Sequence, residues 1–327
     1  MNAQAWWIVQ ISIVSAAILI SFFLILLLRR WRLERQESVK QSQMAAITRT
    51  YLQRIGGFPV EPGGQRWSDE LRLAAISHLH LLLRGGERDR LMQMAELDGL
   101  LRTTLRKSAH LMAERRIDAI RLLQQFGSEA CIARLRELMT RDRNAAVRIE
   151  AAFALASLHA LPPPRELIRI LGLLKRKPNR LDSALLRSTA GKYAEHLQRL
   201  LDEPMSHGHR ALIIDALGWS DDLTVLPTLE RAASTDSAEL RSGALRAAAK
   251  LGHPGAAPWV MRLLDDPVPS VRVQAVNASA ALELRDAVPR LSAMLDDKDL
   301  WVRLRVEEAL EKLVGFAAVT RHGGAAA

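Results

Sequence analysis

The sequence is poor in the residues on which disulfide frameworks, β-sheets and many enzyme sites depend. Cys131 is the one cysteine in 327 residues, so no internal disulfide can form and a reducing compartment fits. Aromatic residues make up only 5% of the chain, and no segment alternates apolar and polar residues over a useful length. Phosphate-binding, dinucleotide-binding, GxSxG, HExxH and CxxC motifs are absent. We therefore predict an all-α protein that is not an enzyme and needs no cofactor.

The formal net charge of +10 is concentrated in one part of the chain. Residues 29–66 hold 8 basic and 3 acidic residues, whereas residues 204–327 hold 14 basic and 16 acidic ones. A nucleic-acid-binding protein usually carries its basic residues on the body that forms the binding surface. We therefore do not expect a nucleic-acid partner, although the basic stretch 165–199 gives that alternative some support.

A run of 21 uncharged residues, Ile8–Leu28, predicts a membrane anchor. As a helix it would span about 31 Å, close to the thickness of the hydrocarbon core of a bilayer. A cleaved signal peptide would need basic residues before the run, and here they follow it. Because positive charge stays on the cytoplasmic side, we predict a single-pass protein of the bacterial inner membrane, with its N-terminus outside and the rest in the cytoplasm. The predicted membrane-interface residues are Trp6, Trp7, Arg29, Arg30, Trp31 and Arg32.

Glycine and proline divide the rest of the chain. Residues 31–55 contain neither and could continue as a polar helix, while Gly56–Gly64 predicts a hinge or linker. The expected parts are an anchor at 1–30, a juxtamembrane helix and linker at 31–66, a helical-repeat body at 67–314 and a flexible tail at 315–327. Small residues four apart in the anchor, Ser12/Ala16 and Ala17/Ser21, would allow a homodimer.

Residues of the same type recur at a period of 31 in the second half of the chain. An arginine column holds Arg210, Arg241, Arg272 and Arg303, and Arg148 lies two periods before Arg210. Six residues after each arginine stands an alanine, and fourteen before the last three stands a proline: Pro227, Pro258 and Pro289. An aspartate column holds Asp142, Asp266 and Asp297. A fixed period of this length indicates stacked helix pairs, and in the last one we expect helix A at Asp286–Leu295 and helix B at Leu300–Val314.

These columns resemble HEAT repeats, close to the short bacterial form found in phycobilisome lyases. The resemblance covers residues 129–314 except around 165–205, and residues 67–126 look like diverged units. It implies an α-solenoid of helix pairs, in which the arginine and aspartate columns bridge adjacent repeats and the B helices line the concave surface.

One stripe of each B helix is mostly polar and should face solvent. It contains Asp215 and, where other repeats have small or charged residues, Trp219 and Trp301. Exposed tryptophan beside arginine is typical of protein-binding hot spots, although such rings can also fold over the core. The predicted partner-binding residues are Trp219, Arg246, Lys250, Trp301, Arg305, Glu308 and Lys312. Trp259, on a helix A, is a further aromatic residue that departs from the pattern.

Other clusters have simpler explanations. The paired aspartates at 221–222, 265–266 and 296–297 recur in the turns between helices, where they would cap backbone N–H groups. His207 and His209 have no cysteine or carboxylate at ligand spacing, so we expect no metal there, and Cys131 suits packing.

The function that fits best is a membrane-tethered scaffold that binds partner proteins in the solenoid groove, for example in envelope or exopolysaccharide assembly. The alternative is a nucleic-acid-binding protein similar to DNA glycosylases with HEAT-like repeats. A lyase activity would follow only from the resemblance to phycobilisome proteins.

Overall fold

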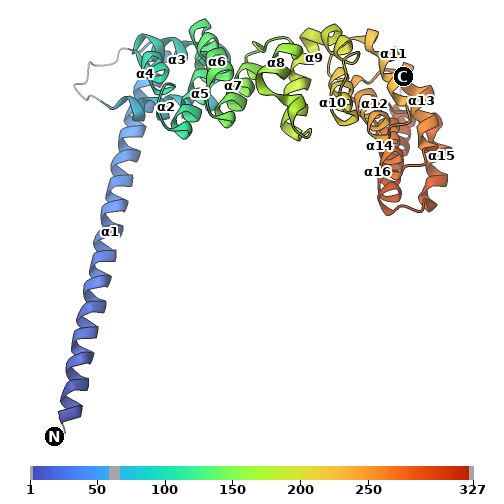
Figure 1. The fold of residues 1–327 in the computed structure, drawn as a ribbon. Helices are drawn as coiled ribbons and strands as arrows, with labels where there is room; N and C mark the ends of the chain where they lie inside the picture. The colour runs from blue at the N-terminus through green and yellow to red at the C-terminus, as the bar shows by residue number, and fades with distance from the viewer. Residues whose placement is uncertain (1–2, 59–66, 324–327) are drawn as a thin grey trace. The chain divides into compact units, whose positions relative to one another are not determined.

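The computed structural model describes the backbone of residues 3–58 and 67–323, and side chains within 20–58 and 67–315 except those of residues 33, 34 and 36. All regular structure in these ranges is helical (Figure 1). The α-helices are α1 Ala3–Ile55, α2 Asp69–Leu82, α3 Gly85–Leu97, α4 Leu100–Lys107, α5 Ala113–Phe126, α6 Glu129–Arg141, α7 Ala145–Ser157, α8 Pro164–Leu171, α9 Arg180–Leu200, α10 His207–Leu217, α11 Leu226–Ala233, α12 Ala238–Leu251, α13 Ala257–Arg262, α14 Pro269–Ala281, α15 Val288–Ala293 and α16 Leu300–Gly323. The chain divides into unit 1 (Met1–Leu111 and Arg121–Phe126) and unit 2 (Met112–Ile120 and Gly127–Ala327).

Unit 1 is built around the C-terminal turns of α1. Ile47, Tyr51 and Ile55 are buried against α2 and α3, because apolar residues four apart form one stripe of the helix. A polar network closes this packing: Asp98, which follows α3, accepts hydrogen bonds from Tyr51 Oη at 2.7 Å, from Arg54 at 2.8 Å and from Arg72 at 2.6 Å. The end of α1 is therefore held by groups from two other segments, Arg72 of α2 and Asp98 after α3.

The network raises the pKa of Tyr51, Arg54 and Arg72 and lowers the pKa of Asp98. Burial, together with the hydrogen bond and charge of Asp98, raises the pKa of Tyr51 to about 12. Burial alone would raise the pKa of Asp98, but hydrogen bonds from Arg54 and Tyr51 and the nearby guanidinium charges lower it below its ordinary value. The folded state therefore favours a neutral tyrosine beside an ionised aspartate.

Unit 2 contains the repeats as two layers of helices. The B helices α10, α12, α14 and α16 pack one after another, and each A helix, α11, α13 or α15, packs on the B helix that follows it. In Figure 1 the B helices form the inner layer of the curve in this unit. Helix A of the last pair is a short α-helix extended at both ends by 3-10 turns, over residues 285–296. The prediction of a HEAT-type solenoid of helix pairs is confirmed.

The repeat columns have distinct structural roles. Prolines 227, 258 and 289 stand in the first turn of α11, α13 and α15, where the missing N–H costs nothing. The alanine column is buried between neighbouring B helices, and so are Ile213, Ala244, Ala275 and Val306, three residues after each arginine. Asp222, Asp266 and Asp297 accept backbone N–H groups two residues further on. Asp222 caps the 3-10 turn that precedes α11, as predicted, whereas Asp266 and Asp297 accept N–H groups within the turns that precede α14 and α16.

Arginine–aspartate pairs, which we call rungs, connect successive repeats. Arg241 donates through Nε and Nη2 to the two carboxylate oxygens of Asp266, 25 residues further on, at 2.6 and 2.9 Å. Arg272 pairs in the same way with Asp297, at 2.9 and 2.7 Å. It also donates through Nη1 to the backbone carbonyl of Asp266, which belongs to its own repeat. Arg116 and Asp142 form an equivalent pair.

The predicted membrane location is wrong. Among the residues that the structure describes, no helix combines the length and the apolar character needed to cross a bilayer. The apolar run with described side chains, Ile20–Leu28, spans about 14 Å as a helix, roughly half of a hydrocarbon core. The side chains of residues 8–19, which include most of the predicted span, lie outside the described residues, as do those of Trp6 and Trp7. A single-pass inner-membrane protein with its N-terminus outside is therefore not supported.

The remaining residues of the predicted interface lie on α1, where Arg29, Arg30, Trp31 and Arg32 are exposed. The guanidinium of Arg35 stacks on the Trp31 ring at 5.1 Å. Residues 59–66 of the expected linker and 324–327 of the expected tail lie outside the described residues, while α16 continues to Gly323.

Candidate functional site

Three helices of unit 2 bring an aromatic ring and several charged groups together. Arg187 comes from α9, Asp215 from α10 and both Arg246 and Lys250 from α12, while Trp219 follows the C-terminal end of α10. Helix α10 packs between α9 and α12, so residues of the two outer helices reach the same side of it. We call this group the Trp219 cluster.

Asp215 is the buried centre of the cluster, with 3% of its surface exposed. Its Oδ2 accepts a hydrogen bond from Arg187 Nε at 2.7 Å, and its Oδ1 accepts one from Arg246 Nε at 3.0 Å. Ser183 Oγ donates to Oδ2 at 3.4 Å. Because a buried carboxylate needs such partners, each of the two guanidinium groups is held at one oxygen of Asp215.

Trp219 lies above this pair with 42% of its surface exposed. The Lys250 ammonium stands 4.3 Å from the ring centroid, and the Arg187 guanidinium 5.4 Å from it. Both distances fall within the range of cation–π attraction, so the ring is held in place without being buried. With three basic side chains and one acidic one, the cluster carries a net charge of +2, and its Trp219 ring remains partly exposed.

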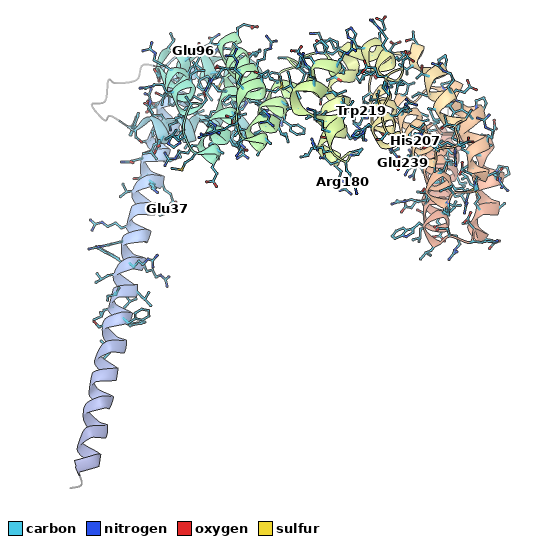
Figure 2. The ribbon with its side chains drawn as sticks, in the orientation of Figure 1. Glu37, Glu96, Arg180, His207, Trp219 and Glu239 are labelled. Carbon is cyan, nitrogen blue, oxygen red and sulfur yellow. The ribbon has the colours of Figure 1, made fainter. Side chains whose placement is uncertain are left out.

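Figure 2 labels Trp219 together with Arg180, His207 and Glu239, on the inner side of α9, α10 and α12. The N-terminal ends of these helices lie close together, because a side chain at Gly208 would meet Pro178 at 3.2 Å and Glu239 at 3.6 Å. The inner face therefore continues from the Trp219 cluster toward a rim with charges of both signs.

The structure joins three of the seven predicted partner-binding residues in this cluster: Trp219, Arg246 and Lys250. The other four lie on α16, which is separated from α12 by α14. Trp301 is 66% exposed, and Arg305 is paired with Glu308 one turn away, while Lys312 is exposed on the last turns of described side chains. These four residues form a second exposed group on the same layer of helices.

Two members of the cluster, Asp215 and Arg187, were not among the predicted partner-binding residues. Asp215 was expected to face solvent with the rest of its stripe, yet it is buried because two arginines cover it. Arg187 lies outside the 31-residue period, so the spacing of the repeats could not predict that it pairs with Asp215. Trp259 is a core residue with 2% exposure, packed between the helix layers.

His209 has a structural role. Its Nδ1 lies 2.7 Å from Ser206 Oγ, and its Nε2 lies 2.9 Å from the carbonyl oxygen of Arg176. A carbonyl can only accept, so Nε2 carries the proton and Ser206 Oγ donates to Nδ1. Within the described part of the chain, no group of three histidine, cysteine or acidic residues is placed to hold a metal ion. Cys131 is buried.

The family model for HEAT repeats matches residues 194–278 and 234–311. These ranges include α10 to α15 and most of the Trp219 cluster. None of the curated proteins compared with the sequence matches it. Residues 194–311 are therefore similar to HEAT repeats.

The chain is similar to several solved structures. Human deoxyhypusine hydroxylase is 20% identical, with 85% of this chain and 98% of that chain covered and a TM-score of 0.34. The CpcE–CpcF complex of phycocyanin lyase from Nostoc sp. PCC7120 is 16% identical, with 78% and 98% covered and a TM-score of 0.37. A mutant of Kap121p is 12% identical, with 83% and 37% covered and a TM-score of 0.44. At these values the three structures assign no activity to this chain.

The prediction that the chain is not an enzyme needs correction. It rested on the repeats and on the absence of known motifs, but deoxyhypusine hydroxylase and phycocyanin lyase are enzymes by name. Helical repeats of this kind therefore do not exclude catalysis, and the exclusion drawn from the sequence is overturned.

Proposed function

We propose that the chain is a protein-binding scaffold and that an acidic segment of a partner protein binds at the Trp219 cluster. The observation that carries this proposal is the exposed Trp219 ring with two cations within cation–π distance, on a helix face with net positive charge. Tryptophan and arginine are enriched at protein-binding hot spots, and a rigid ring loses little conformational entropy on binding.

The cluster supplies two kinds of contact to such a segment. Arg246 uses Nε on Asp215, and no hydrogen bond of its Nη groups occurs within the described residues, so these groups can pair with a carboxylate of the partner. The Lys250 ammonium, 4.3 Å from the ring centroid, can pair with a second carboxylate. The uncovered part of the Trp219 ring would then pack against an apolar side chain between the two acidic residues.

The group on α16 extends the proposal. A second part of the same partner would bind at Trp301, Arg305, Glu308 and Lys312. These residues lie on the same layer of helices as the Trp219 cluster, because α14 packs against both α12 and α16. The envelope or exopolysaccharide setting and the homodimer stay predictions from the sequence.

The proposal is tested with random 12-residue peptides displayed on phage and selected on the full chain. We expect enrichment of peptides that carry two or more acidic residues around an apolar one. Trp219→Ala and Lys250→Glu should each weaken binding of the selected peptides by about tenfold, which corresponds to roughly 1.4 kcal/mol. Lys298→Glu, which makes the same charge change at an exposed position of unit 2, should leave the affinity within about twofold.

Two results would contradict the proposal. Peptides that bind Trp219→Ala as tightly as the wild type would exclude the cluster as the binding surface. A steeply salt-dependent affinity for duplex DNA, lost in Lys250→Glu, would instead support the nucleic-acid alternative.

A further inference from the structure

The junction that follows Arg210 in unit 2 lacks a rung. Arg241 and Arg272 each reach an aspartate 25 residues further on, but 25 residues after Arg210 stands Thr235. The hydroxyl of Thr235 donates to the carbonyl of Ala232 at 2.9 Å. The junction between α10 and α11–α12 therefore has the arginine of a rung without its carboxylate.

The guanidinium of Arg210 is left with an unused donor. Its Nη2 donates to the backbone carbonyl of Glu203 at 3.3 Å, as the arginines of the other repeats do to their own turns. Its Nε is buried and has no hydrogen-bond partner within the described residues. In the rungs this nitrogen donates to aspartate at 2.6 to 2.9 Å. A buried charged donor without an acceptor is unfavourable, so the site gains stability from any acceptor that reaches it.

A cavity of about 530 Å³ lies at this position. Arg210, Thr235 and Leu240 line it together with residues from the C-terminal end of α9 and from α11. Its basic residues are Arg199, Arg210 and Arg231, and its acidic residues are Glu195 and Asp202. Because Glu195 is paired with Arg199 at 2.7 Å, it does not compete for Arg210. Gln198 and Thr228 add neutral groups that can donate or accept hydrogen bonds.

We propose that this cavity binds a small organic carboxylate, whose carboxylate group takes the place that aspartate fills in the rungs. The intact rungs show that the arginine of this column binds a planar, two-oxygen acceptor through Nε and Nη2. The cavity is far larger than one carboxylate and has the size of a small-molecule site, so the ligand is a free molecule with a polar body. None of its lining residues belongs to the Trp219 cluster, so this site is separate from the proposed partner-binding surface.

The test is a titration of the full chain with succinate at constant ionic strength, followed by calorimetry and by the melting temperature. Uncharged succinamide is the matched ligand control. We expect wild type to bind succinate at least about tenfold more tightly than succinamide, because only the carboxylate pairs with the guanidinium. Arg210→Lys, which removes the two-pronged donor, should weaken succinate binding by about tenfold.

The deciding variant is Thr235→Asp, which restores the missing rung. It should melt at a higher temperature than wild type and lose succinate binding, because its own carboxylate then occupies Arg210. Thr235→Ser, which keeps the hydroxyl, should bind as wild type does. The proposal is overturned if wild type binds succinate no better than succinamide, or if Thr235→Asp binds succinate as tightly as wild type.

Discussion

At the scale of single residues, Gly218 sets how closely two B helices approach. It ends α10 directly against α12, where an added Cβ would lie 2.5 Å from the Cα and O atoms of Ala247. Backbone atoms cannot yield as a flexible side chain can, so the helices would have to separate. We expect Gly218→Ala to lower the free energy of unfolding by about 1–3 kcal/mol, measured by urea denaturation.

Gly191 provides the matched control. It lies within α9, where an added Cβ would meet no atom within 4 Å. Gly191→Ala should leave stability unchanged or raise it by up to about 1 kcal/mol, because alanine restricts the unfolded chain. Equal losses in both variants would show that close approach is not the reason for glycine at position 218.

Asp215 is the second position where one residue decides the local arrangement. Removing its carboxylate leaves the guanidinium groups of Arg187 and Arg246 without the buried acceptor that they share. We expect Asp215→Ala to cost about 3 kcal/mol in the free energy of unfolding. Glu307→Ala, at an exposed acidic residue of α16, should change it by less than about 0.5 kcal/mol. A similar small effect for Asp215→Ala would mean that the three-helix pairing does not stabilise unit 2.

At the scale of elements, the rungs explain why the repeats stack at a fixed register. The pair of Arg272 and Asp297 is mostly shielded from solvent, with 15% and 11% of the side chains exposed. A double-mutant cycle with Arg272→Met and Asp297→Asn should give a coupling energy of about 2 kcal/mol, read from urea denaturation of the four proteins. Additive effects of the two substitutions would contradict a direct pairing.

Near the end of α1, the hydrogen bond from Tyr51 to Asp98 connects this helix to the segment that follows α3. A pKa raised to about 12 means that folding favours the protonated phenol. This contribution is complete below the ordinary tyrosine pKa near 10, and it is lost as the pH rises from about 10 to 12. We therefore expect wild type to lose on the order of 2 kcal/mol more than Tyr51→Phe over that interval, followed by denaturation at each pH. The matched control is Tyr193→Phe, which should lose stability in parallel with wild type.

The elements that the sequence predicts well are those fixed by repeated local chemistry. Proline at the start of helix A, aspartate in the turns and alanine between B helices follow from backbone rules that act within a few residues. The partners of Asp215 could not be predicted in this way. Arg187 comes from α9, whose enlarged preceding loop breaks the 31-residue period, so the meeting of these side chains depends on packing between elements.

At the scale of the whole molecule, both units depend on ionised aspartates. In unit 2, the pKa of Asp297 is lowered chiefly by its hydrogen bond from Arg272. Burial opposes the shift at Asp142, but hydrogen bonds from Arg116 and the Asn144 N–H outweigh it and lower the pKa. In unit 1, the pKa of Asp98 is lowered as well. These groups stabilise the folded state above their ordinary pKa near 4, and the stabilisation is lost as the pH falls through the lowered values.

We therefore expect a decline in stability below about pH 4, measured by denaturation between pH 7 and pH 2. Asp297→Asn should be less stable at pH 7 and should lose less than wild type as the pH falls. Parallel curves for the two proteins would show that Asp297 does not contribute to the acid dependence.

At this scale, the predictions of a membrane location and of a protein without catalytic activity failed. The apolar N-terminal run suggested a bilayer, and the repeats suggested a body without catalysis. Neither property follows from the periodicity that identified the fold, because a fold does not by itself determine function.

The shared carboxylate of Asp215 also makes the two sides of α10 interdependent. A ligand that draws the Arg187 guanidinium away frees one oxygen of Asp215, and Arg246 can then take both. Occupancy beside α9 thus alters the electrostatic potential that a second ligand meets beside α12, without a change of backbone. By reciprocity, the second ligand alters the affinity for the first by the same factor. Two segments of a partner bound along this face would therefore not bind independently of each other.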